Sequence, residues 1–227
     1  MGSQQGLRER KKAQQREHIA DTAAALFAER GFDAVSMADV ARAADVSDQT
    51  VYNYFPSKPD LVLDRADEYR GLYGRAVLNR SDGQSPADAI RPLVMSAIEF
   101  YLEEQPRLAR GEFPALCLQS GTLRRFALEL REEQAQHLTV ALLETDPGIH
   151  TVVAQAHAAA LVSVVQSITD AVGRAVIDAS SPQETATRMR DDAAAALDHL
   201  DQMFRSALVL NSQTPHTTAT LLNGEQS

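Results

Sequence analysis

Helix-start signals recur along this chain, and no segment sustains the alternation of polar and apolar residues that a strand requires. Residues 85–88 (Ser-Pro-Ala-Asp) and 181–184 (Ser-Pro-Gln-Glu) each join a capping hydroxyl, a proline at the first helical position and an acidic residue in the first turn. Residues 36–39 (Ser-Met-Ala-Asp) lack only the proline. The pattern predicts an all-α fold.

The expected helices cover most of the chain. Of the 227 residues 44% are hydrophobic, which is enough to fill a buried core. We expect helices near residues 9–30, 37–44, 48–54, 58–80, 86–104, 107–119, 122–145, 148–178 and 182–208.

Composition and motifs argue against several classes of protein. No uncharged apolar run approaches the ~18 residues of a membrane span. No hydrophobic segment follows the basic N-terminus, so we expect a cytoplasmic protein with no membrane partner. The single cysteine, Cys117, excludes an intramolecular disulfide framework and a multi-cysteine zinc site. The sequence contains no glycine-rich phosphate loop, Gly-x-Ser-x-Gly or His-Glu-x-x-His, so we expect no enzyme, cofactor or metal site.

Charge is distributed unevenly between the two ends of the sequence. Residues 1–58 hold eight basic and eight acidic side chains, so the whole net charge of −9 lies in residues 59–227. Within residues 1–16, five basic side chains accompany one acid, Glu9. A basic end on an acidic body is typical of a protein that meets nucleic acid at one end. A solvated charged tail explains the same pattern by charge alone.

Residues 31–58 have the pattern of a helix-turn-helix. A short helix after Ser36 is followed by a tight turn, and Ser47 then caps a second short helix whose Val51 and Phe55 face inward. In this motif the second helix enters the major groove, ~12 Å wide, and amide side chains such as Gln49 read base edges. We expect Asp48 to act as a cap instead of a base reader. Two short core helices are the structural alternative.

The same stretch resembles the TetR-type bacterial transcriptional regulators. The resemblance lies in residues 19–27, 31–41 and above all 46–61, where Tyr52, Phe55 and Lys58 match the family's tyrosine-x-x-phenylalanine followed by lysine. It implies that Tyr52, Tyr54 and Lys58 contact the DNA backbone and that the polar residues of the second helix approach bases. Residues 48–49 (Asp-Gln) depart from the family's frequent lysine-glycine, which leaves the operator sequence open.

From these residues and this resemblance we predict a DNA-binding set and three regions. Residues 1–58 form a helix-turn-helix domain with a basic arm, residues 59–208 an all-helical regulatory and dimerisation domain, and residues 209–227 a flexible tail. The predicted DNA-binding residues are Arg16, Ser36, Arg42, Ser47, Asp48, Gln49, Thr50, Tyr52, Asn53, Tyr54 and Lys58.

The body carries two further patterns. Small residues share a face in residues 148–178 (Ala154, Ala158, Ala160, Ser163, Ser167, Ala171 and Ala175). An apolar stripe runs along residues 182–208 (Ala186, Met189, Ala193, Leu197, Leu200, Phe204 and Ala207 or Leu208). By the resemblance, residues 148–208 pair with a second copy in a homodimer; packing within one subunit is the alternative. Aromatic residues and the cysteine collect between the two ends and predict an apolar effector pocket, with core packing as the alternative. The predicted ligand-binding residues are Tyr69, Tyr101, Phe113, Cys117, Phe126 and His157.

The function expected from these patterns is repression of transcription. A dimer would bind a double-stranded inverted-repeat operator and be released by a small-molecule effector. Residues 106–125 loosely resemble family members that respond to apolar or acyl-type effectors, which implies an effector of that kind here. The rival interpretation is a helical ligand-binding or enzymatic protein whose N-terminal domain no longer binds DNA; the acidic body and Asp48 favour it.

Overall fold

The computed structural model describes residues 2–62, 70–102 and 112–213, and every regular element in these ranges is a helix. The elements are α1 (Gly2–Arg30), α2 (Met37–Ala43), α3 (Asp48–Tyr54), the 3-10 helix η1 (Pro59–Leu61), α5 (Leu72–Leu78), α6 (Pro86–Leu102), α7 (Glu112–Gln119), α8 (Gly121–Thr145), α9 (Thr151–Ile177) and α10 (Pro182–Gln213). The predicted all-α fold is confirmed.

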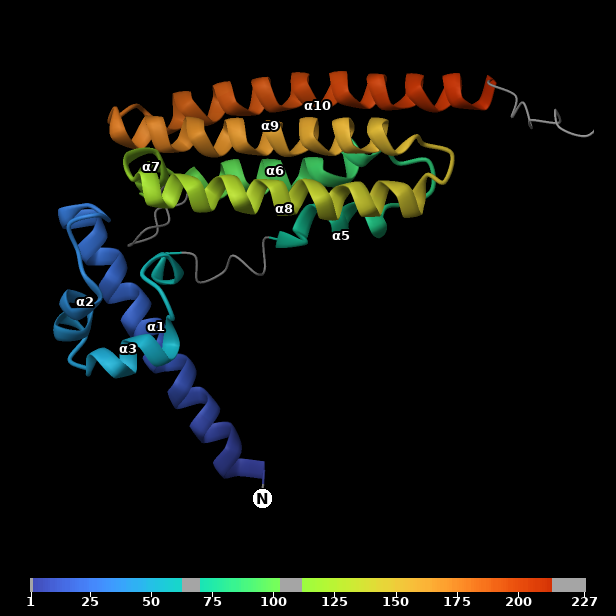
Figure 1. The fold of residues 1–227 in the computed structure, drawn as a ribbon. Coiled ribbons are helices and arrows are strands. Elements are labelled where there is room, and N and C mark those ends of the chain that lie inside the picture. Colours follow the sequence, from blue (N-terminus) through green and yellow to red (C-terminus); the bar gives the residue numbers. More distant parts are fainter. Residues whose placement is uncertain (1, 63–69, 103–111, 214–227) are drawn as a thin grey trace, which may run out of the picture.

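The helices form two groups (Figure 1). α1, α2, α3 and η1 make a small module at one end of the molecule, and α5 to α10 make a long body in which α8, α9 and α10 run side by side. The N-terminal half of α1 extends out of the module.

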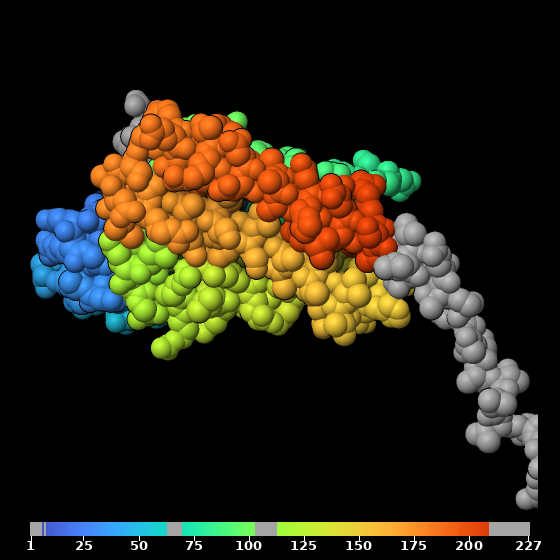
Figure 2. All heavy atoms as spheres, turned by 90° about the horizontal axis from the view of Figure 1, so that it is seen from above, coloured from blue at the N-terminus to red at the C-terminus, as the bar shows by residue number. Residues whose placement is uncertain are grey.

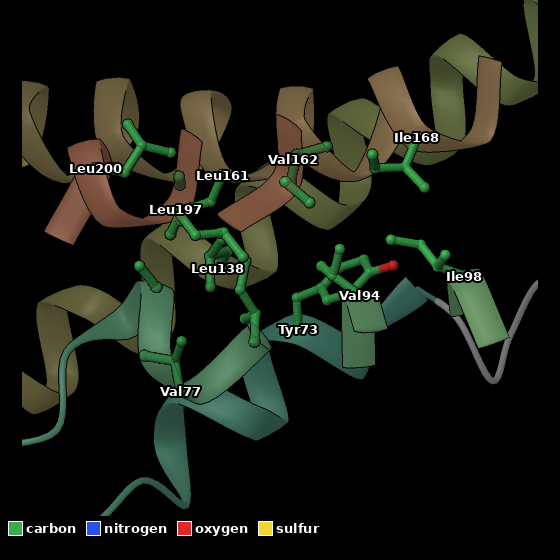
Figure 3. Packing of buried hydrophobic residues seen from close by; sticks show 14 of the residues in the cluster. Tyr73, Val77, Val94, Ile98, Leu138, Leu161, Val162, Ile168, Leu197 and Leu200 are labelled. Carbon is green, nitrogen blue, oxygen red and sulfur yellow. The ribbon is translucent and has the colours of Figure 1, made fainter. Parts of the chain in front are cut away.

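The body has one apolar core, which we call the body cluster. Figure 3 shows Tyr73 and Val77 of α5 meeting side chains from α6, α8, α9 and α10. Ile98, Leu138, Leu161 and Leu197 of these helices are fully buried. Full burial of an aliphatic side chain contributes ~1.5–3 kcal/mol, so this cluster is the main source of the body's stability.

A second apolar core, the module cluster, holds the small module together and also reaches into the body. It contains Ile19, Phe27, Val40, Val51 and Phe55 of the N-terminal helices, all of them almost completely buried. It also contains Leu116 and Cys117 of α7 and Leu123 of α8. The packing boundary between module and body therefore runs through α7 and α8, far along the sequence from residue 58.

The helix expected over residues 58–80 is wrong as a single element. Ser57 donates from its backbone N–H and its hydroxyl to Asp60 Oδ2, at 2.8 and 2.7 Å, and the 3-10 helix η1 follows at Pro59–Leu61. α5 starts at Leu72, after Gly71 in a turn. Glycine is a poor helix former, which accounts for the break. Residues 63–69 lie outside the described residues.

The ends of other helices also differ from expectation. α10 continues to Gln213 instead of ending near residue 208, and Leu208 packs against the body cluster. α1 begins at Gly2 instead of residue 9. The predicted tail from residue 214 onward lies outside the described residues.

The apolar stripe of α10 faces its own subunit. Met189, Ala193, Leu197 and Phe204 are at most 3% exposed, and α10 packs against α6 and α9. This stripe therefore stabilises the body and does not serve a partner chain. By length and composition alone α9 is apolar enough to cross a membrane, and in the structure it packs against α7, α8 and α10.

Candidate nucleic-acid interface

The first helix of the motif, α2, starts with a complete capping box. Ser36 Oγ accepts from the Asp39 backbone N–H at 3.1 Å, and the Ser36 backbone N–H donates to Asp39 Oδ2 at 3.0 Å. The Ser36 hydroxyl also donates to Asp39 Oδ2 at 2.6 Å. These hydrogen bonds lower the pKa of Asp39 to about 2. α2 is thus held by local contacts that the sequence displays directly.

A tight turn joins α2 to α3. Asp45 has a φ of 54°, in the left-handed region that aspartate tolerates better than most residues. The Val46 backbone N–H donates to the Ala41 carbonyl at 3.0 Å, which closes the end of α2. The chain therefore reverses within residues 44–47, as the helix-turn-helix motif requires.

Ser47 caps the second helix, α3. Its Oγ accepts from the Thr50 backbone N–H at 3.1 Å and lies 2.8 Å from Thr50 Oγ1. The expectation that Asp48 provides the cap is wrong, because Asp48 is already the first residue of the helix and is exposed. Val51 and Phe55 are fully buried, so the opposite face of α3 points to solvent.

That outer face carries Gln49, Tyr52 and Asn53. All three are exposed, and Gln49 Nε2 donates to Asn53 Oδ1 at 3.0 Å one helical turn away. This hydrogen bond uses Gln49 Nε2 and Asn53 Oδ1, so Gln49 Oε1 and Asn53 Nδ2 are the atoms that can meet base edges in the major groove.

Two cationic side chains lie beside the motif, each over an aromatic ring. Lys58 Nζ lies 4.2 Å from the centre of the Phe32 ring and donates to the Asp33 carbonyl at 3.4 Å; its partial burial lowers its pKa. The Arg16 guanidinium lies 4.7 Å from the centre of the Phe55 ring. Both are placed before any ligand arrives, which lowers the entropy cost of a phosphate contact.

Two other predicted contacts are occupied by neighbours. Arg42 is largely exposed and pairs with Asp39 at 3.1 Å. Tyr54 is half-buried, and its hydroxyl donates to Gln15 Oε1 at 3.3 Å, so it joins α3 to α1.

The predicted ligand-binding residues divide between the two cores. Tyr101 is buried in the body cluster, while Phe113 and Cys117 pack in the module cluster. Burial raises the pKa of the Cys117 thiol to about 12. Phe126 is half-buried on α8, and Tyr69 lies outside the described residues. This set therefore stays a prediction.

His157, the last of that set, lies at the α9–α10 contact. Its ring centre is 4.7 Å from that of Phe204, and its buried Nε2 has no hydrogen-bond partner among the described residues. Burial lowers its pKa to about 4. The histidine is thus neutral near pH 7.

Three features were not found by sequence reasoning. A groove of about 400 Å³ lies between α9 and α10, with Arg174, Asp178, Arg188 and Asp192 in its lining. Arg124 makes a bidentate ion pair with Asp170, in which Nη1 and Nη2 donate to Oδ1 and Oδ2 at 2.9 and 3.3 Å. Ser120, at the α7–α8 junction, donates to Asp33 of the module at 2.9 Å. The two hydrogen-bonded pairs join residues 46 and 87 positions apart, and the groove forms only where α9 and α10 pack together, so no local pattern reveals these features. No group of three or more potential metal ligands occurs within the described ranges.

Comparison with known proteins identifies the module. The profile of the bacterial regulatory proteins of the tetR family matches residues 19–64, from the buried half of α1 past η1. Residues 19–64 thus carry the helix-turn-helix module of the tetR family. YuxN of Bacillus subtilis, an HTH-type transcriptional regulator, is 31% identical over 106 residues, which are 46% of this chain and 34% of YuxN. The HTH-type transcriptional repressor KstR of Rhodococcus jostii is 32% identical over 99 residues, 43% of this chain and 45% of KstR.

The chain thus spans less than half the length of these two curated relatives. The likeness of fold extends further than that of sequence. The solved structure of a SmeT–triclosan complex superposes with a TM-score of 0.58 at 18% identity, covering 82% of this chain and 89% of SmeT. The body as well as the module therefore has a TetR-type fold.

Proposed function

We propose that this protein is a transcriptional repressor that binds an inverted-repeat DNA operator as a homodimer and is released by a small-molecule effector. The observation that carries the proposal is the outer face of α3. Gln49, Tyr52 and Asn53 are exposed there, and the capped ends and buried Val51 and Phe55 hold the helix rigidly behind them.

A pair of substitutions tests DNA binding. Lys58→Ala removes a cation and should weaken binding to all sequences about equally, with a shallower dependence on salt. Gln49→Ala removes a base-reading amide and should relax preference at one or two base pairs by ~1–3 kcal/mol. Binding to selected and random DNA fragments is measured across a salt series. Wild-type protein that binds no DNA would refute the proposal and favour the rival ligand-binding function.

We further propose that the dimer forms through the outer faces of α9 and α10 (Figure 2). Along α9, the residues exposed at helical spacing are Val152, Ala156, Ala159, Ser163 and Ser167. The open groove is lined from both helices, by Ser167 of α9 and by Arg188 of α10 among others, so these two faces share one side of the body. Small side chains allow two helices to approach closely, and the groove's mixed charges allow a two-fold-related copy to form ion pairs.

Ala159→Glu tests this interface. Two copies of the new carboxylate would face each other near the two-fold axis, so we expect the dimer to dissociate at micromolar concentration in sedimentation experiments. Ala97→Glu, at an exposed position on α6, is the matched control and should leave the dimer intact. An unaffected Ala159→Glu dimer would place the interface elsewhere.

The effector part of the proposal rests on the body's fold and on α7. The solved SmeT complex contains triclosan, and α7 connects the body to the module cluster through Leu116 and Cys117. We propose that a ligand entering near Phe113 and Cys117 shifts α7 and, with it, the module. A ligand found by thermal-shift screening should then bind more weakly, by the same factor, when operator DNA is present. Equal ligand affinities with and without operator DNA would show that this ligand is not the effector that releases the protein from DNA.

A further inference from the structure

α1 is longer than the module needs. Its burial starts at Ile19, from which point its side chains fill the module cluster. Between residues 8 and 18 every side chain is exposed except the half-buried Arg16. Figure 1 shows this N-terminal half running on past α3 as a single free helix.

The basic residues of this half lie on one face of the helix. At 100° per residue, Arg8, Lys11, Lys12, Gln15 and Arg16 fall within a sector of about 140°. Arg10 lies on the opposite face, and the two acids, Glu9 and Glu17, fall outside the sector. We call Arg8, Lys11 and Lys12 the basic face of α1.

Two contacts show where this face points. Gln15 accepts the hydrogen bond of Tyr54 at 3.3 Å, and Arg16 lies over the ring of Phe55 at 4.7 Å. Both partners are at the C-terminal end of α3. The sector that holds the basic face is therefore the sector turned toward α3, and it continues beyond α3 into open solvent.

We propose that the basic face of α1 binds backbone phosphates of the DNA that flanks the base pairs approached by α3. This inference rests on the proposed DNA-binding function and extends it to a second contact area. A helix rises 1.5 Å per residue, so Arg8 lies ~12 Å beyond Arg16, a distance of about 3–4 base pairs. Exposed arginine and lysine without acids on the same face match a phosphate backbone in charge and spacing.

The test compares two variants that lose the same charge from the same helix. Lys12→Gln removes a cation from the basic face, and Arg10→Gln removes one from the opposite face. Binding is measured by a salt series on the operator recovered by selection from random DNA. Two DNA fragments are used. The long fragment has extra base pairs on both sides of the operator, and the trimmed fragment ends at the outermost base pair whose substitution changes binding.

On the long fragment, Lys12→Gln should lower the salt slope by about 0.9 for each phosphate that the protein no longer neutralises, while Arg10→Gln should match the wild type. On the trimmed fragment all three proteins should bind alike. The triple variant Arg8→Gln, Lys11→Gln, Lys12→Gln should enlarge the difference on long DNA about threefold. Circular dichroism confirms that the variants stay helical.

Other results overturn the inference. If Lys12→Gln and Arg10→Gln lower the salt slope equally, the basic face attracts DNA only through net charge and makes no directed contact. The same conclusion follows if Lys12→Gln lowers the slope equally on long and trimmed DNA. A triple variant with an unchanged slope would also overturn it, while operator binding by the wild type would leave the proposed function standing. Wild-type protein that binds no DNA would refute the proposed function, and this inference with it.

Discussion

At the scale of single residues, His157 is a buried histidine that the folded chain keeps neutral. It is 7% exposed, and burial lowers its pKa to about 4. Asp146 and Asp201 act in the opposite direction but do not compensate for the loss of water. An unfolded histidine has a pKa near ~6.5, so between about pH 6.5 and 4 the unfolded chain binds a proton that the folded chain refuses. This contribution to stability is fully present at neutral pH and declines as the pH falls through that window.

We therefore predict that His157→Gln flattens the acid side of the stability curve. The free energy of unfolding of the wild type should fall by up to about 1.4 kcal/mol per pH unit from this residue within the window, and the variant should lose that slope. Urea unfolding from pH 7 to 4 measures it. His199→Gln, at an exposed position on α10, is the control and should keep the wild-type slope. Parallel curves for wild type and His157→Gln would contradict the prediction.

At the scale of elements, a close contact between α7 and α9 depends on Gly173. A Cβ atom at this position of α9 would lie 2.7 Å from the Pro114 carbonyl carbon and 2.8 Å from its oxygen, on α7. These are backbone atoms, so a change of rotamer cannot relieve the clash. The absence of a side chain at Gly173 thus sets the distance between α7 and α9, and α7 carries Leu116 and Cys117 into the module cluster.

Gly173→Ala should consequently destabilise the protein even though alanine is the better helix former. Alanine gains ~1 kcal/mol in helix propensity, whereas overpacking costs typically ~1–3 kcal/mol, and a rigid backbone contact belongs at the upper end. We expect a lower melting temperature. Gly121→Ala meets no atom within 4 Å and serves as the control, with an unchanged or slightly raised melting temperature. A stabilised Gly173→Ala variant would show that α7 moves away freely.

At the scale of the whole molecule, the module and the body are joined by packing and by a hydrogen bond between Ser120 and Asp33. Leu116, Cys117 and Leu123 of the body pack into the module cluster, and beside them Ser120 donates to Asp33 Oδ1 at 2.9 Å. Asp33 also borders Lys58, whose ammonium bonds its carbonyl. A displacement of the α7–α8 junction would therefore move Asp33 through Ser120, and Asp33 in turn contacts Lys58, a predicted DNA-binding residue.

A double-mutant cycle on Ser120 and Asp33 should reveal this link. Ser120→Ala and Asp33→Ala should each lower the free energy of unfolding, and the double variant should lose less than the sum by roughly 1 kcal/mol. Denaturant unfolding gives the four values. Pairing Ser120→Ala with Asp45→Asn, an exposed position, should be additive. Additive losses for Ser120 and Asp33 would mean that the hydrogen bond does not join the two parts.

The all-α class and most of the local construction of the DNA-binding motif follow from the sequence alone. Ser36, Ser47, Val51 and Phe55 were placed correctly, because caps act over three residues and helical periodicity within one or two turns. The interruption at Gly71 was missed, since glycine lowers helix propensity without forbidding a helix.

What each apolar face covers depends instead on the tertiary structure. Periodicity shows that the stripe of α10 is buried, but burial against α6 and α9 and burial against a second copy give the same pattern. The division of Tyr101 and Cys117 between two cores, and the contact of Ser120 with Asp33, involve residues 16 and 87 positions apart. Such arrangements depend on how whole helices pack, because the hydrophobic effect rewards burial without specifying the partner.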